Sequence, residues 1–156
     1  MFRPVSGGVL RIVIADDHAP TRRSLRDQLE GAGFDVCGEA ARGADALQVA
    51  LRERPDVCLL DVLMPGGNGV NAAREIKRAL PETKVVLLTA VPDEEGAVAA
   101  ARAGADGYLG KDTDSSRLSE IVRAIMAGEA AYPRRLLPYV LARRSTRPRF
   151  GRRSET

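Results

Sequence analysis

Short apolar runs alternate along the chain with longer amphipathic stretches, and there are five of each. The apolar runs, rich in β-branched residues, predict strands over residues 9–15, 34–40, 57–60, 84–89 and 107–109. Apolar residues at helical spacing predict helices over residues 21–31, 43–54, 70–80, 93–103 and 115–127. Strands that are apolar on both faces need cover on both faces. We therefore expect an α/β fold with a doubly wound, five-stranded parallel sheet.

Charge divides the 156-residue chain into two unequal parts. Residues 1–131 carry 16 Lys and Arg against 20 Asp and Glu, whereas residues 132–156 carry eight Arg and one Glu. The net charge of +3 thus combines an acidic body with a basic tail. We expect one domain over residues 8–130 and a basic linker or tail over residues 131–156, with a candidate short helix at residues 132–144. The tail has two interpretations, a solvated linker or a contact with DNA phosphates.

The composition argues against several classes of protein. No apolar run approaches the roughly 20 residues of a membrane-spanning helix, and the N-terminus lacks the pattern of a secretory signal, so we expect a cytoplasmic protein. His18 is the only histidine, and Cys37 and Cys58 stand apart inside apolar stretches, which argues against a zinc site or a histidine-dependent hydrolase. We interpret both cysteines as small buried side chains and His18 as a loop residue.

Polar side chains follow four of the five predicted strands, at the point where each strand ends. They are Asp16 and Asp17, Asp61, Thr89 and Lys111. Ligands of an open parallel sheet bind at the carboxyl ends of its strands, so these side chains should converge. Three carboxylates held together repel one another and require a cation, and an all-oxygen set suits Mg²⁺. A carboxylate beside Mg²⁺ and a lysine is equipped to attack a phosphoryl group.

Four segments carry this pattern: RIVIADDHAPTRRSL, PDVCLLDVLMPGGNGV, VVLLTA and ADGYLGKD. Together they resemble the receiver domain of two-component response regulators over about residues 9–130. The resemblance implies the five-stranded (βα)5 flavodoxin-like receiver fold. The DDH start, the LMPGGNG loop and the GYLGKD ending are similar to the NarL/FixJ (LuxR-type) subgroup, whose members usually carry a C-terminal helix-turn-helix.

The resemblance implies a role for each acidic residue. Asp61 would be the phosphoacceptor. Asp16 and Asp17 would hold Mg²⁺, with Asp61 and the backbone carbonyl of Leu63 as further ligands. The alternative is that Asp16 and Asp17 only cap the following helix. An aspartyl hydrolase is a further alternative, but such enzymes usually have a second Asp where this chain has Leu63.

The remaining roles concern binding of the phosphoryl group and the conformational switch. By the same resemblance, Thr89 would hydrogen-bond the phosphoryl group and Lys111 would pair with it. Tyr108 matches an aromatic position that changes rotamer on activation, although a structural tyrosine remains an alternative. Many receivers have a cis proline after the lysine, whereas Asp112 follows Lys111 here. We expect a trans bond or a rearranged loop, because a non-proline cis bond costs about 3–4 kcal/mol.

The loop after Asp61 contains three glycines, Gly66, Gly67 and Gly69, which we expect to bring backbone amides near the phosphate. The implied donor is the phosphohistidine of a sensor histidine kinase or a small acyl phosphate. The implied output is control of transcription through a C-terminal DNA-binding domain, which we expect to be missing because the chain is truncated. Phosphorylation would also favour a homodimer. The alternative is a stand-alone receiver that docks on another protein. We do not expect an enzyme that turns over a free substrate.

Overall fold

The computed structural model describes residues 8–65 and 68–142, and within them it contains one parallel sheet in the order β2-β1-β3-β4-β5. The strands are β1 (Arg11–Ala15), β2 (Asp35–Ala40), β3 (Val57–Asp61), β4 (Lys84–Thr89) and β5 (Gly107–Gly110). The helices are α1 (Ala19–Gly31), α2 (Gly43–Glu53), α3 (Gly69–Ala79), α4 (Glu94–Arg102) and α5 (Ser115–Met126). The predicted doubly wound α/β fold is therefore confirmed.

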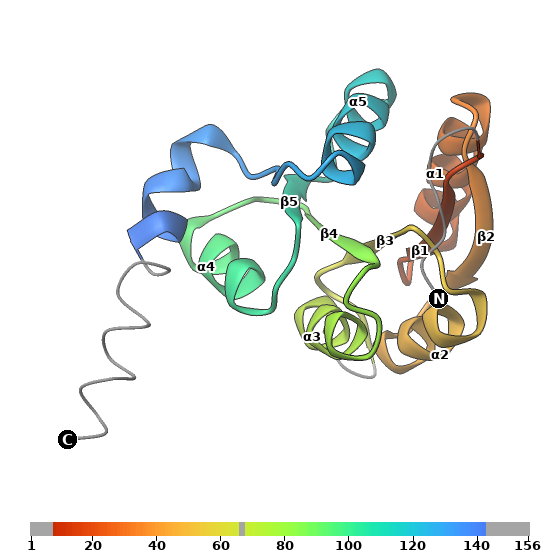
Figure 1. Ribbon diagram of the computed structural model, residues 1–156, viewed down its shortest axis with the longest axis horizontal. Helices are drawn as coiled ribbons and strands as arrows, with labels where there is room; N and C mark the ends of the chain where they lie inside the picture. Colours follow the sequence, from red (N-terminus) through yellow and green to blue (C-terminus); the bar gives the residue numbers. More distant parts are fainter. Residues whose placement is uncertain (1–7, 66–67, 143–156) are drawn as a thin grey trace.

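Helices cover both faces of the sheet, as the apolar strands require (Figure 1). Helices α1 and α5 pack on one face, where Ile14 and Leu59 point into the core. Helices α2, α3 and α4 pack on the other face, where Val13, Cys58 and Leu60 are buried. Neighbouring residues of β3 thus enter opposite cores, and all five of its residues are buried. A strand buried in this way has no polar face, which explains its continuous apolar sequence.

The sheet order places a topological switch point between β1 and β3. From β1 the chain moves outward to β2, and it then returns to place β3 on the other side of β1. Ala15 of β1 lies opposite Leu60 of β3, so the residues that follow both strands emerge side by side. Ligand sites of open α/β sheets form at this crevice.

A capping side chain sets the start of α1, α3, α4 and α5, whereas α2 has no such cap. The Asp93 carboxylate accepts the Gly96 amide at 2.7 Å at the start of α4, and Asp114 caps α5 in the same way. The first helix begins at Ala19, two residues before the predicted start, because His18 is its cap. Its Nδ1 lies 2.6 Å from the Thr21 hydroxyl oxygen. His18 thus has a structural role that its description as a loop residue missed.

The chain after α5 returns to the sheet. Ala131 forms a parallel bridge with Gly107, and its carbonyl accepts the Tyr108 amide at 2.8 Å. Residues 134–142 are helical, within the span of the predicted short helix. Leu136 and Val140 are buried in the core that α2, α3 and α4 share. The packed body therefore continues to residue 142, and residues 143–156 of the predicted tail lie outside the described residues.

No helix within residues 8–65 and 68–142 combines the length and the apolar character needed to cross a membrane.

Candidate functional site

Three carboxylates meet at the carboxyl edge of the sheet, at the switch point. Asp16 and Asp17 follow β1 and Asp61 ends β3, and each offers an oxygen within 4.8 Å of the others. Asp16 and Asp61 are buried, whereas Asp17 is exposed. The structure thus brings together the three acidic residues that the strand ends predicted. Their mutual repulsion makes this a site for positive charge.

Lys111, which follows β5, supplies one positive charge to this cluster. Its Nζ lies 2.8 Å from Oδ2 of Asp16 and 3.3 Å from Oδ2 of Asp61. Burial by itself disfavours the ammonium, but the hydrogen bond and attraction to Asp16, followed by attraction to Asp61, raise the pKa of Lys111. One ammonium against three carboxylates leaves the site with a net negative charge if all four groups are ionised.

Opposing influences act on the buried carboxyl of Asp61. Burial raises the pKa of its carboxyl, the charge of Asp16 adds to this rise, and Lys111 partly offsets both. The other carboxylate oxygen, Oδ1, accepts the Leu63 amide at 3.3 Å. Both oxygens therefore have defined partners, the Leu63 amide and the Lys111 ammonium.

Asp16 is held by its backbone as well as by its side chain. Its amide donates to the Ala40 carbonyl at 3.0 Å, and Arg22 of α1 donates to its backbone carbonyl at 2.6 Å. Its Oδ1 accepts the His18 amide at 2.8 Å. Sequence reasoning did not find Arg22, because one arginine in an arginine-rich chain carries no signal of such a contact. Its guanidinium also pairs with Glu39 at 2.9 Å, which fixes it between α1 and β2.

Gly69 serves the site in a way that the sequence did not indicate. A Cβ at this first residue of α3 would overlap the backbone carbonyl of Asp61. Its amide donates to the Val62 carbonyl at 2.8 Å. Glycine is therefore needed here because α3 starts against the main chain of Asp61. Gly66 and Gly67 lie outside the described residues.

Thr89 and Tyr108 occupy different surroundings. Thr89 ends β4, and its carbonyl accepts the Lys111 amide at 2.8 Å, so the two predicted site residues are neighbours across strands. Tyr108 is buried under α4, and its hydroxyl accepts the Asp93 amide at 3.2 Å. Tyr108 thus contacts the start of α4, the helix that follows the Thr89 loop.

Two apolar side chains, a trans peptide bond and a hollow surround the acidic cluster. The side chains of Leu63 and Val91 are 74% and 73% exposed. No peptide bond in the described part of the chain is cis, so the bond from Lys111 to Asp112 is trans, one of the two expected outcomes. A hollow of about 330 Å³ lies beside Asp16 and Lys111, between α1 and α5.

The fold and the site together define a doubly wound α/β domain with an acidic, lysine-bearing pocket at its switch point. The family model of the response regulator receiver domain matches residues 12–123. The chain belongs to this family and is a receiver domain of a two-component response regulator, which confirms the resemblance seen in the sequence.

Two relatives are named as transcriptional regulators, which supports the NarL/FixJ (LuxR-type) subgroup. The chain is 41% identical over 124 residues to the uncharacterized transcriptional regulatory protein YxjL of Bacillus subtilis, covering 79% of this chain and 57% of that protein. It is 34% identical over 137 residues to the DNA-binding transcriptional activator DevR/DosR of Mycobacterium tuberculosis, covering 86% of this chain and 63% of that protein. The chain thus spans about six tenths of the length of these relatives.

Solved structures of response regulators also share the fold of this chain. A two-component response regulator of the LuxR family from Aurantimonas sp. SI85-9A1 superposes with a TM-score of 0.78 at 29% identity, over 88% of this chain and 99% of that one. The receiver domain of AraT, a response regulator from Geobacillus stearothermophilus, superposes with a TM-score of 0.69 at 33% identity, over 77% and 95% of the two chains.

Proposed function

We propose that this receiver domain accepts a phosphoryl group on Asp61 in a reaction that depends on Mg²⁺. The observation that carries the proposal is the placement of the buried Asp61 carboxylate, 3.3 Å from the Lys111 ammonium and clustered with Asp16 and Asp17. The donor is the phosphohistidine of a sensor histidine kinase or a small acyl phosphate. A bond forms between a carboxylate oxygen of Asp61 and phosphorus. The donor's bond to phosphorus breaks, and its electron pair stays on the nitrogen of the histidine or the oxygen of the acyl group.

The donor atoms of the site suit the metal. Asp16, Asp17 and Asp61 present clustered carboxylate oxygens, the ligand type that Mg²⁺ prefers, and they would hold it with the backbone carbonyl of Leu63. Bound there, Mg²⁺ would supply positive charge that offsets the three carboxylates and the phosphoryl oxygens. The excess of negative charge that remains beside Lys111 supports a second cation at this place.

Two residues of the chain would stabilise the transferred group. The Lys111 ammonium already contacts Asp61, so it can follow the negative charge onto the phosphoryl oxygens. The Thr89 hydroxyl, at the end of the neighbouring strand, would donate a hydrogen bond to one of these oxygens. Movement of Thr89 would then be transmitted to Tyr108 through the loop that joins β4 to α4.

A phosphorylation assay tests the acceptor. The chain is incubated with acetyl phosphate and Mg²⁺, and the modified peptide is located by mass spectrometry. We expect one phosphoryl group on Asp61 and none on Asp61→Asn, which keeps the shape of the side chain and lacks the nucleophilic oxygen. Phosphorylation of the Asn variant at the wild-type rate would refute the assignment.

The proposed output is control of transcription. Both relatives described above are named as transcriptional regulators, and each is longer than the part that this chain matches. We infer that phosphorylation acts through a DNA-binding output domain and through homodimer formation, in a cytoplasmic signalling pathway. Operator binding by the corresponding longer protein, measured with and without acetyl phosphate, tests this step. Binding that is unaffected by phosphorylation would contradict it.

A further inference from the structure

The segment that follows α5 crosses the sheet edge and packs against α4 (Figure 1). We define residues 131–142 as the C-terminal strap. At its start, the Ala131 amide donates to the Asp106 carbonyl at 2.9 Å. Farther along, Leu136 and Val140 are buried in the core that also contains the small apolar face of α4. The strap is therefore attached to the edge strand at one end and to α4 at the other.

The strap also encloses the residue proposed as the switch. The ring of Tyr132 lies 6.3 Å from the ring of Tyr108, centroid to centroid. Its hydroxyl donates to the Ala105 carbonyl at 2.8 Å, which fixes the ring in place. The Tyr108 hydroxyl lies so close to Gly96 that a Cβ there would overlap it. Tyr108 is thus confined between α4 and the strap.

A second contact joins the strap to the loop between Thr89 and α4. The guanidinium of Arg135 donates to the Pro92 carbonyl at 2.8 Å. The next residue of the loop, Asp93, donates its amide to the Tyr108 hydroxyl and caps α4. The strap therefore holds, directly or through Tyr108, the short loop that must move if Thr89 moves.

We propose that the C-terminal strap is an autoinhibitory clamp that opposes movement of Thr89 toward a phosphoryl group on Asp61. Displacement of Thr89 would carry Pro92 and Asp93 with it and stretch their bonds to Arg135 and Tyr108. These contacts are then stronger in the unphosphorylated arrangement, so they disfavour phosphorylation. Because such coupling is reciprocal, phosphorylation should loosen the strap to the same extent. This inference rests on the proposed phosphorylation of Asp61.

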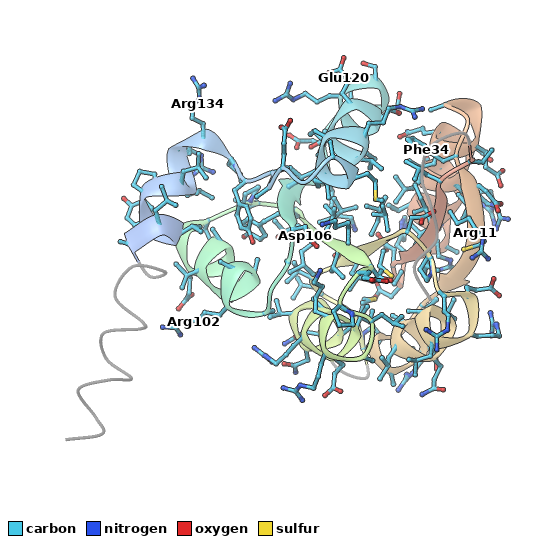
Figure 2. The ribbon with its side chains drawn as sticks, viewed as in Figure 1. Arg11, Phe34, Arg102, Asp106, Glu120 and Arg134 are labelled. Atoms are coloured by element: carbon cyan, nitrogen blue, oxygen red, sulfur yellow. The ribbon has the colours of Figure 1, made fainter. Side chains whose placement is uncertain are left out.

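The test uses beryllofluoride with Mg²⁺ as a mimic of the phosphoryl group. Hydrogen exchange of the strap amides is measured with and without the mimic, and the affinity for the mimic is compared among variants. Arg135→Ala removes the bond to Pro92 at an exposed position, and Arg134→Ala is its control. Figure 2 shows that Arg134 projects from the strap away from the body, so its loss removes the same charge without that bond.

We expect strap amides to exchange faster with the mimic bound. We expect Arg135→Ala to bind the mimic about two- to fivefold more tightly than wild type, the size of one weak hydrogen bond, and Arg134→Ala to match wild type. A bound mimic with unchanged strap exchange, or weaker binding by Arg135→Ala, would overturn the clamp and leave phosphorylation of Asp61 intact. Failure of the wild type to bind the mimic would overturn both.

Discussion

The centre of the sheet and its β5 edge are built in different ways. Strand β3 is buried at all five positions between two layers of helices, and its Asp61 has partners on both carboxylate oxygens. Helix α4, next to β5, buries only Ala97 and Ala100. Because burial of alanine removes little apolar area from water, the position of α4 depends on residues that the strap adds. The centre thus fixes the geometry of the site, and the edge is the part able to move.

Two leucine substitutions would sharpen this comparison most. Leu59 of β3 and Leu136 of the strap are 0% and 1% exposed, so burial alone predicts equal losses. We expect Leu59→Ala to lower the free energy of global unfolding by about 3–5 kcal/mol. We expect Leu136→Ala to lower the free energy of global unfolding by a smaller amount and to act mainly by releasing the strap. Denaturant titration gives the global values, and hydrogen exchange of residues 131–142 gives the local one. Equal losses of the free energy of global unfolding would contradict this distinction between the centre of the sheet and the strap.

A glycine pair tests how tightly the centre is packed around the acidic site. In Gly69→Ala the new Cβ would overlap the Asp61 carbonyl, whereas Gly31, at the end of α1, has no atom within 4 Å of that position. We expect Gly69→Ala to lower the free energy of unfolding by about 1–3 kcal/mol, because backbone must shift. Gly31→Ala should leave stability equal or slightly higher. Thermal unfolding of the two variants measures the difference, and similar melting temperatures would show that the start of α3 is free to move.

Removal of one charge tests whether the acidic cluster behaves as a metal site. Asp17→Asn keeps the size of the side chain and removes one of three anionic ligands. We expect Mg²⁺ affinity to fall about tenfold or more, because a hard cation depends on carboxylate charge. Asp27→Asn, on the exposed face of α1, changes the net charge equally and should have little effect. Mg²⁺ titrations of both variants that match wild type would refute the ligand assignment.

Sequence reasoning was strongest where one pattern had one physical solution. The apolar strands required two layers of helices, and the polar residues at the ends of four strands predicted the cluster of Asp16, Asp61 and Lys111. It was weakest where a contact depends on exact distances between segments that are remote in the sequence. The bond of Arg135 to Pro92 and the contact of Gly96 with Tyr108 leave no pattern in the nearby sequence. Arginine and glycine are both common at exposed positions, so neither residue stands out. The strap was therefore expected only as a tail with a short helix.

The smallest expected effect concerns how long the phosphoryl group would remain on Asp61. Hydrolysis needs a water in line with phosphorus, and Leu63 and Val91 stand two residues after Asp61 and Thr89. Neither apolar side chain can orient a water by hydrogen bonding, so we expect slow loss of the phosphoryl group. Both side chains are largely exposed, so they reach this path only from the rim, and the effect should be modest.

Leu63→Asn and Val91→Glu test this expectation, because each offers a polar group to the attacking water. We expect each variant to lose the phosphoryl group several-fold faster than wild type, about 1 kcal/mol or less in activation free energy. The measurement is the decay of phosphorylated protein after removal of acetyl phosphate. Leu51→Asn, at an exposed position of α2, is the control for added polarity. If the wild type and the two rim variants decay at one rate, the loop geometry around Asp61, rather than these side chains, sets the lifetime.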